Sequence, residues 1–170
     1  MTILGTLYKF HWNSSEDCEK WAQKLAKVIT EIILHDSVMH IWLQGNLGAG
    51  KTTVTRYLLK ALGHQGKVKS PSYSLCEPYE IVVGQYPFAI HHFDLYRMRH
   101  AREWEDSGFK DLLTSPGINL IEWPENAENT LPTPCLQISI EYLNENQRCG
   151  TLIASNLLGQ KIINTFSNGS

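Results

Sequence analysis

The feature that most constrains this chain is the glycine-rich stretch GNLGAGKTT at residues 45–53. Gly45, Gly50, Lys51 and Thr52 fit the G-x-x-x-x-G-K-T pattern of the phosphate-binding loop (P-loop). Glycines let such a loop turn tightly and aim successive backbone N–H groups at phosphate oxygens, and a helix starting near Lys51 adds the positive end of its dipole. The pattern predicts an anion cradle, provided that a strand precedes it and a helix follows it.

The segments on either side of the loop supply that context. The apolar run HIWLQ, residues 40–44, ends directly before Gly45 and predicts a buried strand. The segment VTRYLLKAL, residues 54–62, places its apolar side chains on one face at helical spacing. This order of strand, loop and helix favours a nucleotide site over the alternative, a glycine-rich turn that only starts a helix.

Each part of the loop has an expected role with a bound Mg-nucleotide. Lys51 is expected to neutralise the β- and γ-phosphates, and the Thr52 hydroxyl to ligate the Mg²⁺ that bridges them. The pattern predicts that the nucleotide is held by Gly45, Asn46, Leu47, Gly48, Ala49, Gly50, Lys51, Thr52 and Thr53.

The rest of the chain alternates between helical and extended patterns. Residues 16–34 repeat apolar side chains at helical spacing behind a capping serine, Ser14 or Ser15. Strand patterns occupy residues 79–83, 86–94, 118–123 and 136–143, the first two forming a predicted hairpin around Gly84-Gln85. We therefore expect an α/β fold: one P-loop NTPase-like domain over residues 1–170, with a mostly parallel central sheet, a β-hairpin and flanking helices.

Composition limits the classes of partner and site. The 15 Lys and Arg against 17 Asp and Glu give a net charge of -2, so no global basic field indicates nucleic acid or an anionic membrane. The start of the chain lacks a signal-peptide pattern and no apolar run is long enough to span a membrane, so we expect a cytoplasmic protein. The four cysteines are far apart in sequence and predict reduced structural thiols, and the adjacent His91 and His92 would point to opposite faces of a strand, which disfavours a zinc site.

A P-loop needs a second Mg²⁺ ligand, usually a carboxylate at the end of a buried strand. Asp94 ends the segment FAIHHFD and Glu122 ends INLIE, so either carboxylate is expected at the carboxyl edge of a parallel sheet. These residues alone leave the choice between them open, and a helix cap or a surface ion pair remains an alternative for each.

Four stretches in order resemble the bacterial TsaE (YjeE) family: GNLGAGKTT, VKSPSYSLCEPY at 68–79, HHFDLYR at 91–97 and LIEWPE at 120–125. The family is known as a small P-loop ATPase that works with TsaD and TsaB to form threonylcarbamoyladenosine at the adenosine that follows the tRNA anticodon. The resemblance implies an ATPase that drives or resets the TsaD-TsaB assembly without transferring the threonylcarbamoyl group itself. Because the chain has no global basic field, we expect tRNA to be met through the complex.

The resemblance also implies roles for single residues. It favours Thr52 and Glu122 for Mg²⁺ and gives Asp94 a switch-like catalytic role. Within the SPSYS segment, residues 70–74, it implies that the Ser72 hydroxyl senses the γ-phosphate or places water, whereas the plain alternative is a proline-containing turn. At the base end of the nucleotide it implies Ser14 and Arg148, for which a helix N-cap and a solvated turn arginine are the alternatives.

Two other classes of function stay open beside the ATPase. A small-molecule kinase would direct the γ-phosphate to an acceptor other than water, but the sequence has no arginine-rich lid segment. A binding module would use ATP only as a conformational ligand, docking with TsaD-TsaB without obligatory hydrolysis.

Overall fold

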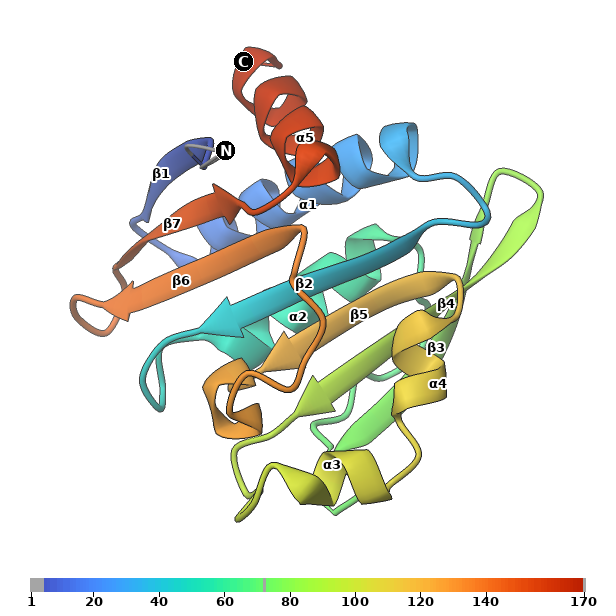
Figure 1. Cartoon of the computed structure of the whole chain (residues 1–170). Helices are drawn as coiled ribbons and strands as arrows, with labels where there is room; N and C mark the ends of the chain where they lie inside the picture. The colour runs from blue at the N-terminus through green and yellow to red at the C-terminus, as the bar shows by residue number, and fades with distance from the viewer. Residues whose placement is uncertain (1–4, 72, 170) are drawn as a thin grey trace.

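A mixed sheet forms the centre of the computed structural model, which describes residues 5–71 and 73–169 (Figure 1). In the described part of the chain this sheet has seven strands in the order β1-β7-β6-β2-β5-β4-β3. The strands are β1 (Leu7–Trp12), β2 (Val38–Gln44), β3 (Cys76–Val83), β4 (Tyr86–Asp94), β5 (Gly117–Glu122), β6 (Leu136–Tyr142) and β7 (Arg148–Ala154). The helices are α1 (Ser15–Ile32), α2 (Lys51–Ala61), α3 (Arg102–Asp106), α4 (Lys110–Thr114), the 3-10 helix η1 (Pro124–Ala127) and α5 (Leu157–Asn168).

The central strands β6, β2, β5 and β4 run parallel, whereas the pairings at both edges of the sheet are antiparallel. This arrangement confirms the α/β class and the mostly parallel centre, and the β3–β4 hairpin turns at Gly84, which has a left-handed φ of 65°. Strand β5 is buried at every position. Its complete burial reflects cover on both faces, as is usual for a central parallel strand.

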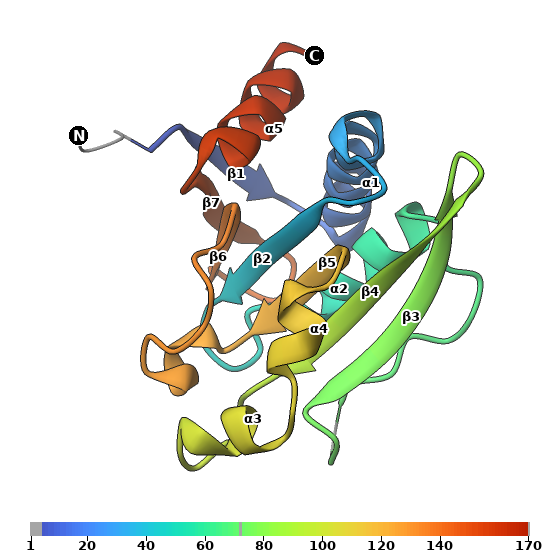
Figure 2. The ribbon, with the colours of Figure 1, turned by 45° about the vertical axis from the view of Figure 1, so that its right-hand side comes forward.

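Helices cover both faces of the sheet (Figure 2). On one face α1, α2 and α5 bury a large apolar cluster that includes Leu25, Leu58 and Phe166. On the other face the short helices α3, α4 and η1 contribute to a smaller cluster that includes Trp104 and Leu113. Among the described helices, none combines the length and the apolar character that crossing a membrane requires.

The structure extends two predicted strands toward their amino ends, β2 from 40 to Val38 and β3 from 79 to Cys76, and adds several elements that the patterns did not reveal. Helix α2 begins at Lys51, as the P-loop pattern predicts, because Gly50 takes up a left-handed conformation and ends the loop there. The sequence analysis also missed β1, β7, α3, α4 and α5.

Strand β7 shows why a pattern can fail. It includes the polar Arg148 and Thr151 and a glycine, Gly150, so its residues do not alternate as a half-buried strand should. A Cβ atom on Gly150 would meet the Ser139 carbonyl and the Phe10 ring, which shows how closely β6 and β1 approach it. The neighbouring strands impose the extended conformation that the local sequence does not indicate.

Candidate functional site

The loop between β2 and α2 owes its path to glycines in conformations that other residues rarely adopt. Gly45 has a φ of 149°, and a Cβ atom there would lie 2.5 Å from the carbonyl oxygen of Ile140. Gly50, with a φ of 111°, is the N-cap of α2 and turns the chain into the first helical turn. The loop therefore places its backbone at the amino end of α2, where free N–H groups and the helix dipole favour an anion.

Lys51 folds back over this loop. Its side chain is only 5% exposed, and Nζ donates hydrogen bonds to the carbonyls of Gly45 at 2.5 Å and Asn46 at 3.0 Å. Burial lowers the pKa of Lys51, and the nearby carboxylate of Glu122 partly offsets that effect. The amine is thus held at the loop by carbonyl oxygens, the kind of ligand that a phosphate oxygen can replace.

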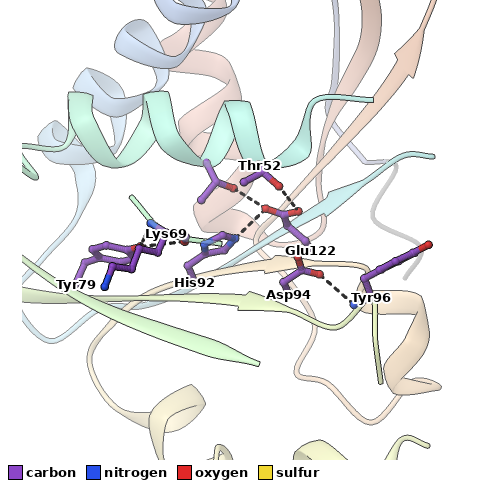
Figure 3. A network of polar contacts seen from close by, with 8 residues as sticks. Thr52, Lys69, Tyr79, His92, Asp94, Tyr96 and Glu122 are labelled. Carbon is purple, nitrogen blue, oxygen red and sulfur yellow. Dashed lines mark hydrogen bonds and ion pairs between the residues drawn. The ribbon is translucent and has the colours of Figure 1, made fainter. Parts of the chain in front are cut away.

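Glu122, at the end of β5, lies beneath the first turn of α2 (Figure 3). The carboxylate is 2% exposed, and its two oxygens have different partners. Oε2 accepts a hydrogen bond from the Thr52 hydroxyl at 3.0 Å. Oε1 contacts the Thr55 hydroxyl at 3.4 Å and Nε2 of His92 at 2.8 Å. The sheet and α2 thereby bring together two of the predicted site residues, Thr52 and Glu122, that are 70 positions apart.

Asp94 ends the neighbouring strand β4 and is paired with Glu122 in the parallel register. Its Oδ1 accepts the backbone N–H of Tyr96 at 3.0 Å (Figure 3). Burial raises the pKa of Asp94 above its ordinary value, and the hydrogen bond from Tyr96 opposes this rise. Both candidate carboxylates therefore lie at the same edge of the sheet, but Glu122 is the one that contacts Thr52.

These groups line a cavity of about 450 Å³. Its walls come from the P-loop, the ends of β4 and β5 and the segment that precedes β3, and they include Lys51, Thr52, Asp94, Glu122 and Trp123. Oxygen donors from a hydroxyl and carboxylates are the ligands that Mg²⁺ prefers, so Thr52 and Glu122, with Asp94 beside them, suit that ion. The P-loop and the oxygen donors thus line one cavity.

A second cavity, of about 210 Å³, adjoins the loop and includes Gly50 and Thr53 in its lining. Ser14 and Arg148 both line it, so the fold brings these two distant residues to one place. Ser14 is also the N-cap of α1, since its Oγ accepts the N–H of Asp17 at 3.2 Å. The capping alternative is therefore correct, and it coexists with a position at the cavity wall.

Arg148 is not a solvated turn arginine. Its Nε donates to the carbonyl of Ala49 at 2.9 Å, and one terminal nitrogen donates to the carbonyl of Asn144 at 2.6 Å. The guanidinium also lies 4.5 Å from the centre of the Tyr142 ring. Arg148 therefore ties the β6–β7 turn to the P-loop, and it lines both cavities.

The SPSYS segment reaches the larger cavity through Ser70 and Pro71. Ser72, the predicted catalytic hydroxyl, lies outside the described residues. Tyr73 is 96% exposed, and the Ser74 hydroxyl donates to the carbonyl of Cys76. The segment thus borders the cavity at Ser70 and Pro71 and faces solvent at Tyr73.

The sequence analysis missed His92 and Thr55, two side chains that contact Glu122. Strand alternation does place His92 and Asp94 on the same face of β4, two residues apart, and this signal could have linked His92 to the site. The His91 ring lies on the opposite face, where its Nδ1 contacts Asn119 Oδ1 at 3.1 Å. Within the described ranges, no group of three or more His, Cys, Asp or Glu residues is arranged to hold a metal.

Comparison with known proteins identifies the family. A family model described as threonylcarbamoyl adenosine biosynthesis protein TsaE matches residues 12–149. The chain belongs to the TsaE family. The matched range spans the P-loop, Asp94 and Glu122, so the residues of the larger cavity lie in the part that defines the TsaE family.

Individual TsaE proteins show the same relationship. The chain is 40% identical to the tRNA threonylcarbamoyladenosine biosynthesis protein TsaE of Haemophilus influenzae over 149 residues, covering 88% of this chain and 90% of that protein. It is 36% identical to TsaE of Bacillus subtilis over 106 residues, covering 62% of this chain and 63% of that protein. The crystal structure of Bacillus subtilis YdiB has the same fold, with a TM-score of 0.73, 23% identity and coverage of 98% and 97% of the two chains.

Proposed function

We propose that this TsaE-family protein hydrolyses Mg-ATP in the cytoplasm to support the formation of threonylcarbamoyladenosine in tRNA, together with TsaD and TsaB. Membership of the family ties the chain to the biosynthesis of this modified nucleoside. The P-loop between β2 and α2 supports the use of a nucleoside triphosphate.

The observation that carries the proposal is the contact between Thr52 and Glu122, 3.0 Å long, beside the amine of Lys51. In P-loop NTPases a hydroxyl at the start of the helix and a carboxylate at the end of a strand hold Mg²⁺ beside the β- and γ-phosphates. Thr52 and Glu122 meet in that arrangement, and both are oxygen donors suited to a hard cation. When bound, Mg²⁺ neutralises the charge that develops on the phosphate oxygens during transfer.

The remaining groups of the larger cavity complete the proposed hydrolysis site. Lys51 exchanges its loop carbonyls for phosphate oxygens and holds the γ-phosphate. Asp94, fixed by the N–H of Tyr96, orients the attacking water, and the Ser72 hydroxyl joins it from the switch-like segment. The loop backbone from Gly45 to Thr53 cradles the phosphates.

The smaller cavity suits the base end of the nucleotide. It adjoins the P-loop at Gly50 and Thr53, Glu122 is not part of its lining, and Ser14 and Arg148 line it with polar groups. A nucleotide with its phosphates in the larger cavity can extend its nucleoside into the smaller one, since the two cavities share Gly50, Thr53 and Arg148.

Hydrolysis drives or resets the TsaD-TsaB assembly between rounds, while the transfer chemistry stays with those partners. With a formal charge of -2, the chain carries no general attraction for RNA, so tRNA contact comes through the complex. Activity of the isolated chain is weak, because partners can complete water placement and charge stabilisation, as GTPase activators do.

Phosphate release from Mg-ATP tests the proposal, measured for the chain alone and with its cognate TsaD-TsaB pair, with Lys51→Ala as the control. We expect release to be stimulated by the partners and lost in Lys51→Ala. A rate of phosphate release that is the same with and without TsaD-TsaB would contradict the proposed role. Repeated product formation with a slowly hydrolysed ATP analogue would favour a nucleotide-gated docking module, and a phosphorylated metabolite would favour a kinase.

A further inference from the structure

The two oxygens of the Glu122 carboxylate are held from different sides. Oε2 contacts Thr52 at the wall of the larger cavity. Oε1 turns toward the protein interior, where His92 Nε2 lies 2.8 Å away and the Thr55 hydroxyl 3.4 Å away. Since His92 makes the shorter of these two interior contacts, it has the stronger hold on the direction of the carboxylate.

The geometry of His92 suits it to this task. The ring is 0% exposed and projects from β4, which pairs directly with β5. A carboxylate oxygen can only accept, so the nitrogen that faces it, Nε2, carries the hydrogen. Among the described residues the other ring nitrogen, Nδ1, has no hydrogen-bond partner, so within that part of the chain Glu122 is the polar partner of this side chain.

We infer that His92 is a positioning residue for the metal-binding carboxylate: its Nε2–H holds Oε1 of Glu122 so that Oε2 stays beside Thr52 and open to Mg²⁺. The inference rests on the proposed Mg-ATP site. Mg²⁺ demands near-ideal octahedral geometry, so a carboxylate that can rotate binds it less well. Residues that hydrogen-bond a metal-ligating carboxylate typically change metal affinity 10–100-fold when they are replaced.

Its neighbour on the strand provides a natural contrast. His91 is also buried and also makes a hydrogen bond from its ring, but its partner is Asn119 on the opposite face of the sheet. Replacing His91 therefore removes a comparable buried polar contact without touching Glu122. A loss caused only by repacking would be shared by both histidines, whereas a loss of carboxylate positioning belongs to His92 alone.

The test measures how strongly Mg²⁺ improves ATP binding, by isothermal titration calorimetry of ATP in Mg²⁺ and in EDTA. The variants are His92→Leu, which removes the donor, and His92→Gln, whose amide N–H can take the place of Nε2–H. His92→Asn has an amide one methylene shorter that cannot reach Oε1, and His91→Leu is the control. Thermal unfolding of each variant gives its stability separately.

We expect His92→Leu and His92→Asn to weaken Mg²⁺-dependent binding about 10–100-fold, with ATP affinity in EDTA unchanged. The His92→Gln variant should retain most of the gain in ATP affinity that Mg²⁺ gives. The His91→Leu variant should retain all of it, even if its thermal stability is lower. Full Mg²⁺ dependence in both Leu and Asn variants would overturn the inference and leave the proposed function intact. A loss of Mg²⁺-dependent binding in His92→Gln as large as in the Leu and Asn variants would also overturn the inference. Absence of Mg²⁺-dependent binding in the unaltered protein would overturn the proposed site and the inference together.

Discussion

The amine nitrogen of Lys51 lies 4.0 Å from the centre of the Trp123 ring. Trp123 directly follows Glu122 in the chain. Trp123 has a left-handed backbone φ of 57°, uncommon for a bulky residue, and its ring also packs on Tyr96 with centroids 4.9 Å apart. Strained residues gather at functional sites, and here the strained conformation puts an aromatic face against the P-loop lysine. The ring thus marks the position that Lys51 occupies when it contacts the loop carbonyls.

Nucleotide binding should therefore be visible in the fluorescence of Trp123. When phosphates draw Lys51 away from the loop carbonyls, the indole loses its cationic neighbour and its emission changes. We expect a clear change on adding Mg-ATP that disappears in Trp123→Phe. Trp104→Phe, which alters a buried tryptophan in α3, is the control that should keep the change. If the Trp123→Phe variant still showed the full emission change on adding Mg-ATP, this view would be contradicted.

Gly45 should be the least replaceable glycine of the loop. Alanine there meets the Ile140 carbonyl at 2.5 Å and an unfavourable φ, so we expect Gly45→Ala to destabilise the fold by roughly 2–4 kcal/mol, combining the clash with backbone strain. Gly48→Ala is the matched control, because its Cβ meets nothing within 4 Å and adds only the strain of its φ of 79°, about 1–2 kcal/mol. Urea unfolding measures the free energy of unfolding of both variants. Equal losses in Gly45→Ala and Gly48→Ala would refute the predicted clash with Ile140.

Asp94 should lower stability at neutral pH. Burial raises the pKa of this carboxyl above its ordinary value of 3.8, so the folded state favours its protonated form more than the unfolded state does. The stabilisation from that preference is complete below pH 3.8 and is lost as pH rises through the folded-state pKa. We expect Asp94→Asn, which can still accept the Tyr96 N–H, to be more stable than the unaltered protein at pH 7, with a smaller gain near pH 4.

Urea unfolding of both proteins at these two pH values provides the measurement. A gain that stays constant from pH 7 to pH 4, or a variant less stable at pH 7, would show that the carboxylate is not penalised in the fold. The same variant should lose ATP hydrolysis under the proposed function, so stability and activity should move in opposite directions.

Arg148 should stiffen the P-loop. Its planar guanidinium reaches the carbonyls of Ala49 and Asn144 at once, which a lysine ammonium cannot reproduce. We expect Arg148→Lys to destabilise the protein by about 1 kcal/mol and to speed amide hydrogen exchange at residues 45–50. Arg102→Lys, at an exposed position in α3, is the control. If amide hydrogen exchange at residues 45–50 were unchanged in Arg148→Lys, Arg148 would not stiffen the P-loop.

The cysteines should differ in reactivity. All four thiols, each in the described part of the chain, are free, and Cys18, Cys76 and Cys135 are buried. Burial raises the pKa of Cys18 and Cys76 to about 12 and that of Cys135 to about 11, so these thiols stay protonated at pH 8. We expect alkylation of the native protein to modify the half-buried Cys149 first, and of the denatured protein to modify all four. Mass spectrometry of the modified peptides distinguishes these results.

Local patterns in the sequence determined a large part of this molecule. The P-loop could be predicted because its glycines, Lys51 and Thr52 follow a fixed spacing, and the flanking strand and helix because apolar periodicity is a local signal. The hairpin at Gly84 and the buried strands that end at Asp94 and Glu122 followed from the same kind of information, as did the family resemblance that the comparison confirmed.

Only the tertiary structure decided which groups meet. Asp94 and Glu122 end adjacent parallel strands in register, so their sequence contexts are alike, and the placement of α2 over β5 brings Thr52 to Glu122. The contact between His92 and Glu122, and the extended conformation of β7, likewise depend on neighbouring strands from distant parts of the chain. Such relationships arise from packing between elements, and local periodicity carries no information about which elements pack together.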